Sequence, residues 1–146
     1  MRKTLLWMAA ALMGALCGCV GTGVAPYDYG VAVGTAAYVG YERVAERQDG
    51  EFRARVAELW ARVDAIDSAE DLGGQLAAIA ADMSALVEDG RLTDADRAAL
   101  RALAAMVLNR VEGKVADGAE KHPEAVEVLR GVRDGVDAMR TIAQAQ

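Results

Sequence analysis

The chain of 146 residues is poor in the side chains that enzymes most often use for nucleophilic and metal chemistry. Its histidine, cysteines and serines are limited to His122, Cys17, Cys19, Ser68 and Ser84. With one histidine, a multi-histidine metal site is excluded, and neither serine lies in a nucleophile-elbow context. His122 precedes a proline, and we expect it to be a solvated loop residue. We therefore predict no catalytic residue, no cofactor and no metal site.

Disulfides and a basic surface are also lacking. Both cysteines fall within the first nineteen residues, so the rest of the chain has no thiol to pair. Two prolines and a hydrophobic content of 53% favour helix, and no useful stretch alternates as a strand would. The net charge is −6, and it becomes −8 without Arg2 and Lys3, because 14 basic residues then face 22 acidic ones. An acidic chain lacks the basic footprint of a nucleic-acid binder, so no such partner is expected.

The first nineteen residues have three zones. Arg2 and Lys3 are positive, residues 5–16 form an apolar run without charge, and Leu16-Cys17-Gly18-Cys19 follows. A positive start, a short apolar stretch and a small-residue exit are typical of a secretory signal. The run is too short to span a bilayer comfortably as a helix.

The tetrapeptide Leu16-Cys17-Gly18-Cys19 resembles the lipobox of bacterial lipoproteins. The resemblance implies that residues 1–18 are a lipoprotein signal peptide, that cleavage follows Gly18, and that Cys19 carries the acyl chains. In Gram-negative lipoproteins an aspartate after this cysteine commonly retains the protein at the inner membrane. Val20 stands there instead, so the resemblance implies an envelope protein anchored in the outer membrane and facing the periplasm.

Residues 19–41 form a second zone, with the lipidated cysteine and then a tether or helix start rich in glycine, alanine and tyrosine. Gly21, Gly23 and Pro26 disfavour helix, so residues 20–26 are interpreted as the tether. From about Asp28 a helix with small residues four apart becomes compatible with the sequence, and such spacing lets helices approach closely.

This segment resembles the glycine-zipper segments of some outer-membrane lipoproteins, which implies self-association or contact with the bilayer. The residues assigned to that contact are Gly30, Ala32, Gly34, Ala36, Tyr38, Gly40 and Tyr41. The contact is predicted if one helix continues through residues 28–66, because the following helices would then leave residues 30–41 uncovered. The alternative is a small-residue helix that packs on its own domain.

Residues 42–146 are predicted to be an α-helical domain. Two apolar seams have spacings of four and three residues, a period of 3.5 as in coiled coils. The first comprises Phe52, Val56, Leu59, Val63 and Ile66, with Trp60 beside it; the second comprises Leu72, Leu76, Ile79, Met83 and Leu86. Ser68 and Asp71 resemble a capping box, which places a turn between two antiparallel helices.

Two further helices are expected. Gly90 suits a left-handed position after the second helix, and Thr93 with Asp96 caps the third. The third helix has an inner face of Leu100, Leu103, Val107, Val111 and Val115. The fourth begins after His122-Pro123 and turns inward Val126, Leu129, Val132, Val136, Met139 and Ile142. The predicted fold is all-α, a small helical hairpin bundle of three to four helices after a lipid-anchored tether.

Two acidic clusters flank the second helix. They comprise Asp64, Asp67, Glu70 and Asp71, and then Glu88, Asp89, Asp94 and Asp96. An enzyme would need Asp64, Glu88 and Asp96 in one pocket for acid–base work, but carboxylates at turns also favour helix N-termini. Residues 89–96 resemble the second half of an EF-hand loop. The first-half ligand positions fall on Ala85 and Val87, which offer no side-chain oxygen, so we expect a turn between two helix caps.

The predicted function is a non-enzymatic lipid-anchored envelope protein that acts as a helical structural or interaction module. Its expected partners are the membrane, through the lipid anchor, and a second copy or another envelope protein. The alternative is a phage-encoded lysis or envelope-modifying lipoprotein, because the layout resembles the outer-membrane partner of two-component spanins. Those partners are often richer in proline than this chain.

Overall fold

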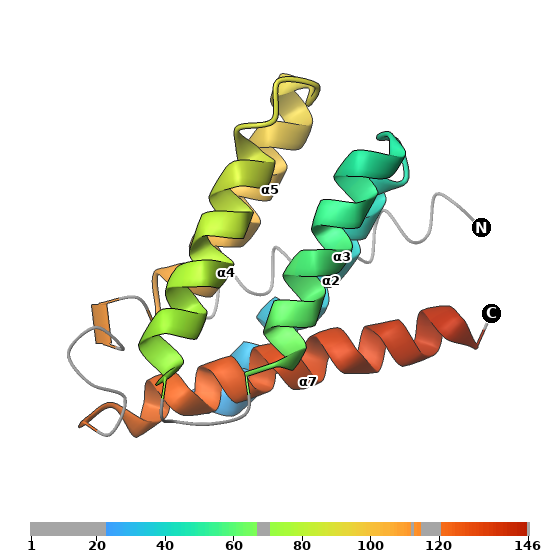
Figure 1. Ribbon diagram of the computed structural model, residues 1–146. Helices are drawn as coiled ribbons and strands as arrows, with labels where there is room; N and C mark the ends of the chain where they lie inside the picture. Colours follow the sequence, from blue (N-terminus) through green and yellow to red (C-terminus); the bar gives the residue numbers. More distant parts are fainter. Residues whose placement is uncertain (1–22, 67–70, 112, 115–120, 146) are drawn as a thin grey trace.

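The computed structural model describes residues 23–66, 71–111, 113–114 and 121–145, and this part of the chain is helical without strands. The principal helices, shown in Figure 1, are α2 (Pro26–Ala45), α3 (Gly50–Asp64), α4 (Leu72–Val87), α5 (Asp94–Leu108) and α7 (Pro123–Gln144). The predicted all-α bundle is confirmed. α3, α4, α5 and α7 are the four helices expected after residue 42, and α2 is a fifth.

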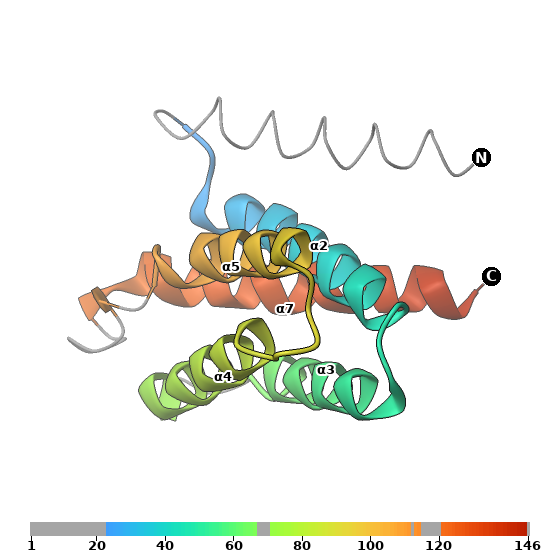
Figure 2. The same ribbon diagram turned by 90° about the horizontal axis from the view of Figure 1, so that it is seen from above.

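The helices form two groups around one core. Figure 2 shows α3 and α4 on one side of the bundle and α2, α5 and α7 on the other. α3 and α4 run in opposite directions (Figure 1), as predicted from the break between their seams. The most extensive contact in the fold joins α2 to α7, which are about a hundred residues apart in the sequence.

Both predicted seams are buried. Phe52 and Leu59 are fully enclosed on α3, and Ile79, Met83 and Leu86 are enclosed on α4. Alternating spacings of three and four residues keep these side chains on one side of each helix, so the two helices share an apolar interface. Burial of a leucine or phenylalanine side chain contributes roughly 1.5–3 kcal/mol, and packing of this kind is the main stabilisation expected for a chain without disulfides in its body.

Side-chain caps define several helix boundaries. The Thr93 hydroxyl oxygen accepts a hydrogen bond from the Asp96 backbone N–H at 3.1 Å, which confirms the predicted cap of α5. The α7 helix begins at Pro123, also as predicted. Asp49 caps α3 by accepting from the Phe52 N–H at 2.9 Å. This cap follows the end of α2 at Ala45, so one continuous helix through residues 28–66 is wrong.

Close contact between glycines joins α2 to α7. A Cβ atom on Gly34 would lie 2.8 Å from the Val132 Cα atom, and one on Gly131 would lie 2.8 Å from the Val31 backbone nitrogen. Gly30 and Gly135 meet the backbone of the opposite helix in the same way. The two helices therefore approach to a distance at which side chains are excluded, and Cα–H···O contacts become accessible.

Two boundary predictions are corrected, and a third is not tested. The domain begins at α2 rather than at residue 42, because Val33, Ala37 and Tyr41 belong to the same buried core as the later helices. Gly90 does not adopt positive φ; the turn is instead closed by the Asp89 carboxylate, which accepts from the Arg91 backbone N–H at 3.0 Å. The Ser68 cap lies outside the described residues.

The inner faces of the last two helices also differ in part from the prediction. α5 ends at Leu108, and although Val111 is fully buried, Val115 lies outside the described residues. Ile142 was predicted to point inward but is 50% exposed. The last turns of α7 extend beyond the neighbouring helices (Figure 1). The apolar repeat of α7 therefore continues into turns that have no core to pack against. None of the described helices has the length and apolarity needed to span a membrane.

Candidate functional site

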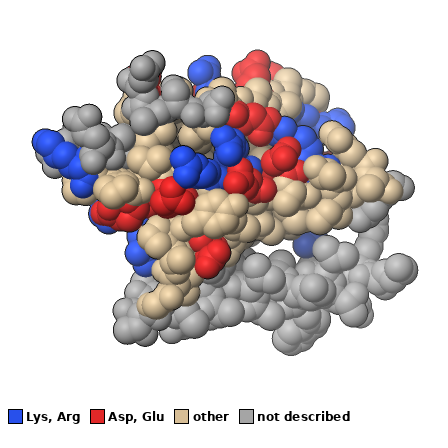
Figure 3. Space-filling model, turned by 90° about the horizontal axis from the view of Figure 1, so that it is seen from below, with Lys and Arg blue, Asp and Glu red and all other residues tan. Residues whose placement is uncertain are grey.

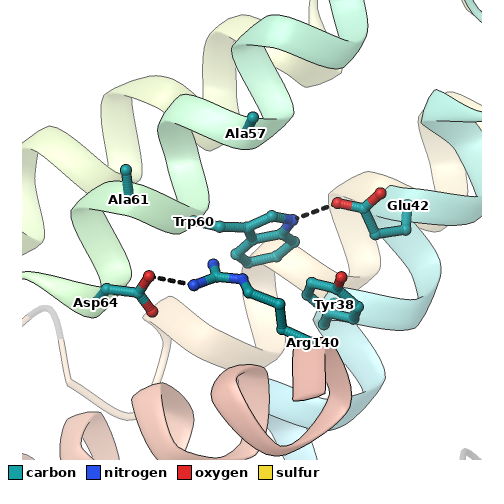
Figure 4. A pocket seen from close by; sticks show the side chains of 7 residues that line it. All are labelled: Tyr38, Glu42, Ala57, Trp60, Ala61, Asp64 and Arg140. Carbon is teal, nitrogen blue, oxygen red and sulfur yellow. Dashed lines mark hydrogen bonds and ion pairs between the residues drawn. The ribbon is translucent and has the colours of Figure 1, made fainter. Parts of the chain in front are cut away.

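The described surface has a hollow of about 270 Å³ where α2, α3 and α7 meet. Figure 4 shows its lining, which comprises Tyr38, Glu42, Ala57, Trp60, Ala61, Asp64 and Arg140. We call it the aromatic hollow. Its charged and aromatic side chains come from three helices that the fold brings together, and no sequence motif joins them.

Hydrogen bonds fix the polar groups of the aromatic hollow. The Trp60 indole N–H donates to Glu42 Oε1 at 2.9 Å, and the Arg140 guanidinium pairs with the Asp64 carboxylate (Figure 4). The Tyr38 and Trp60 ring centroids are 5.5 Å apart. These contacts hold four groups in a defined arrangement: the Trp60 indole, the Glu42 and Asp64 carboxylates, and the Arg140 guanidinium.

The charges in the aromatic hollow affect its titratable groups. Burial and the nearby Glu42 carboxylate raise the pKa of Tyr38, because both disfavour the phenolate. The hydrogen bond to Asp64 raises the pKa of Arg140, so this guanidinium remains charged at any physiological pH. The aromatic hollow therefore presents a neutral phenol, an arginine bound to a carboxylate, and the Glu42 carboxylate.

The segment predicted to mediate self-association or bilayer contact is packed inside this chain. Gly30, Gly34 and Tyr41 are buried, and Ala32, Ala36, Tyr38 and Gly40 are partly buried. The expectation that residues 30–41 are uncovered was wrong, because α7 packs against Gly30 and Gly34 and Leu103 of α5 packs against Gly40. The observed geometry is that of the alternative, a small-residue helix that packs on its own domain.

The three acidic residues that an enzyme would need in one pocket are not brought together. Asp64 pairs with Arg140, Glu88 with Arg101 at 3.5 Å, and Asp96 with Arg47. Each carboxylate thus has its own arginine on a different pair of elements. Asp67 and Glu70 lie outside the described residues. Figure 3 shows positive and negative side chains interleaved across one face of the molecule, which agrees with this pairwise neutralisation.

Asp89 is the exception among these carboxylates because it is buried and has several partners. Its side chain is 6% exposed and accepts from Arg55 and Arg91, with nitrogen–oxygen distances of 2.7 Å. Hydrogen bonds from the Arg91 side chain and backbone hold the pKa of Asp89 well below its usual range. The segment that resembles half of an EF-hand loop is therefore a turn whose aspartate is bound by arginines. Among the described residues no group of three or more acidic, histidine or cysteine side chains is placed to hold a metal ion.

His122 precedes α7, as the sequence indicates. Its side chain is 28% exposed, and its Nδ1 lies 3.5 Å from Glu124 Oε1. It is therefore half-buried at a helix start rather than fully solvated.

Tyr41 offers a test of the packing behind the aromatic hollow. Its ring is fully buried and meets Trp60 edge-on at 5.7 Å, while its hydroxyl has no hydrogen-bond partner within the described part of the chain. A buried polar group without a partner costs about 1–3 kcal/mol. Tyr41→Phe is therefore expected to raise the free energy of unfolding by about 1 kcal/mol in urea denaturation.

The matched control is Tyr29→Phe, because the Tyr29 hydroxyl donates to the Met106 carbonyl at 3.1 Å. Its loss is expected to destabilise the protein by about 1 kcal/mol. An equal destabilisation by both substitutions would contradict the account of Tyr41.

The lipobox-like residues and Cys19 lie outside the described residues, so their assignment rests on sequence alone. The aromatic hollow was not predicted, although Trp60 was recognised beside the first seam and Tyr38 was assigned to a different contact. In comparisons with known proteins, no family model, curated protein or solved structure matches the chain.

Proposed function

We propose that this chain is a lipid-anchored protein of the bacterial envelope and acts there as a non-enzymatic helical interaction module. The observation that carries the proposal is the tetrapeptide Leu16-Cys17-Gly18-Cys19 after a positive and then apolar start. Processing as in the lipoproteins that it resembles would leave Cys19 as the acylated first residue of the mature protein.

The position of the first described helix is compatible with such an anchor. Seven peptide links separate Cys19 from Pro26, where α2 begins, and they span at most ~25 Å. The proposal therefore holds the start of α2 close to the bilayer. The α2 helix of 20 residues is ~30 Å long, and Asp49 after α2 pairs with Arg91 in the turn after α4, so these two turns lie together at the opposite end of α2 from the proposed anchor.

The chemistry of the body supports an interaction role over catalysis. Its arginines are used to tie helices together: Arg62 of α3 binds Asp82 of α4 at 2.6 Å, and Arg55 of α3 binds Asp89 in the turn after α4. Such pairs satisfy charges between elements and fix the packing of the helices. A rigid body on a short tether is well suited to present a surface to another envelope component.

Cys19→Ala is expected to abolish incorporation of labelled palmitate and to release the protein from the membrane fraction. The reason is that the thiol of Cys19 is the proposed attachment point, and anchoring by acyl chains supplies about 0.8 kcal/mol per buried methylene. The measurement is metabolic labelling followed by fractionation of inner membrane, outer membrane and soluble periplasm.

Cys17→Ala is the matched control, because it removes a thiol two residues away and leaves the proposed acceptor intact. It should retain both the label and the outer-membrane location. Palmitate incorporation that persists in Cys19→Ala, or an unlabelled parent protein, would reject the proposal.

A further inference from the structure

We propose that the aromatic hollow binds an aliphatic primary ammonium group of about the size of a lysine side chain. The inference goes beyond the proposed envelope role, and it does not depend on the lipid anchor. It rests on the charge balance, the aromatic walls and the size of the hollow between α2, α3 and α7.

The charge balance leaves one carboxylate without a cation. Asp64 is neutralised by Arg140, whose guanidinium it binds. Glu42 accepts one hydrogen bond, from the neutral Trp60 indole, and no cation pairs with it within the part of the chain that the structure describes. The hollow therefore has a net negative charge of one from its lining residues. A half-buried carboxylate that lacks a cation favours a positively charged ligand.

The aromatic rings favour the same kind of ligand. Tyr38 and Trp60 lie beside Glu42 and Arg140 in the aromatic hollow (Figure 4). Trp60 is only 3% exposed and Tyr38 is half-buried, so the Tyr38 ring provides most of the aromatic surface that a ligand can reach. An aromatic ring face attracts an ammonium ion through its quadrupole, and this attraction grows as the ion loses water. The ligand's ammonium group would donate to Glu42, while its methylene groups would contact the rings.

The size of the hollow limits the ligand. A volume of about 270 Å³ lies just below the range of ordinary ligand pockets and accommodates a short aliphatic chain. Ala57 and Ala61 form part of its lining and are exposed, so access is not blocked by large side chains. Because Arg140 already contributes a planar guanidinium to the hollow, the remaining space suits a compact ammonium better than a second guanidinium. An anion is disfavoured because it would face Glu42.

The test is a fluorescence titration of the full chain in detergent with Trp7→Phe, so that Trp60 is its single tryptophan whether or not residues 1–18 are removed. Butylammonium chloride is the free-amine probe, and a capped Gly-Lys-Gly peptide is the probe for a lysine side chain. Sodium chloride and butanol at equal concentrations control for ionic strength and for apolar binding. We expect a saturable change in Trp60 emission with at least one of the two amine probes and with neither control.

Glu42→Gln tests the role of the charge, because glutamine retains an oxygen that can accept from the Trp60 indole. It should weaken binding of the amine probe by at least tenfold, whereas Glu58→Gln, which changes an exposed carboxylate on α3 outside the hollow, should leave binding unchanged. Ala61→Leu fills the hollow from an exposed helix position and should also abolish binding without affecting folding.

Saturation by the peptide alone would assign the hollow to a lysine side chain of a partner polypeptide, and saturation by butylammonium would assign it to a free amine. No saturable response to either probe would overturn the proposal. Equal binding in the parent, Glu42→Gln and Ala61→Leu proteins would overturn it as well.

Discussion

Replacement of Gly131 by alanine is expected to lower the free energy of unfolding by about 3 kcal/mol, the upper end of the usual cost of overpacking. The new Cβ atom would lie 2.8 Å from the Val31 backbone nitrogen and closer still to the Tyr27 carbonyl oxygen. Neither atom belongs to a side chain that can rotate away, so α2 and α7 would have to separate. The better helix propensity of alanine, worth up to ~1 kcal/mol, offsets only part of this cost.

Gly34→Ala should have a similar effect from the other side of the crossing, where the Cβ atom would meet the backbone of Val132. Gly50→Ala is the matched control, since a Cβ atom there has nothing within 4 Å. Thermal unfolding followed by circular dichroism should show a loss of about 10 °C for the first two variants. Unchanged melting temperatures for Gly34→Ala and Gly131→Ala would contradict the close crossing of α2 and α7.

Asp89→Asn is expected to destabilise the protein by about 2–3 kcal/mol at neutral pH, because a buried carboxylate that two arginines share would be lost. Asp89 accepts from Arg55 on α3 and from Arg91 in its own turn, and thus joins α3 to the connection between α4 and α5. Asparagine keeps one acceptor oxygen but removes the charge that both guanidinium groups face. Asp94→Asn is the control, because the Asp94 side chain is fully exposed and should change stability by less than about 0.5 kcal/mol.

The same pair of proteins has a predicted pH dependence. The pKa of Asp89 is lowered in the folded state by its hydrogen bonds to Arg91, whereas an unfolded aspartate titrates near pH 3.9. A group with a lowered folded pKa stabilises the protein fully above its unfolded pKa and loses that contribution as the pH falls through the folded pKa. Urea titrations should therefore give a constant difference between the parent and Asp89→Asn from pH 7 to 5 and a smaller one at pH 3. A difference that stays the same at pH 3 would exclude this linkage.

The features that could be predicted are those that depend on residues close together in the sequence. The seams of α3 and α4 were identified because a period of 3.5 residues is visible within a single helix. The seam residues of α3 are buried accordingly, namely Phe52, Val56, Leu59, Val63 and Ile66. The Thr93 cap and the Pro123 start were predicted because each depends on a few adjacent residues. The folded chain has these helix boundaries because packing and capping favour the same ones.

The contacts between distant segments were not predicted. Glycines four apart occur at Gly30 and Gly34 and again at Gly131 and Gly135, but nothing local indicates that these two pairs contact each other. Self-association was therefore predicted for the first pair, whereas α7 provides the partner within the same chain. The aromatic hollow was not predicted for the same reason, because Tyr38, Trp60 and Arg140 meet only after three helices have packed.

Mass spectrometry of the N-terminal peptide of protein purified from the outer membrane tests the central claim most directly. The account predicts a peptide that begins at Cys19 and carries acyl chains on that residue. An N-terminal peptide that begins at another residue, or one in which Cys19 is unmodified, would contradict it.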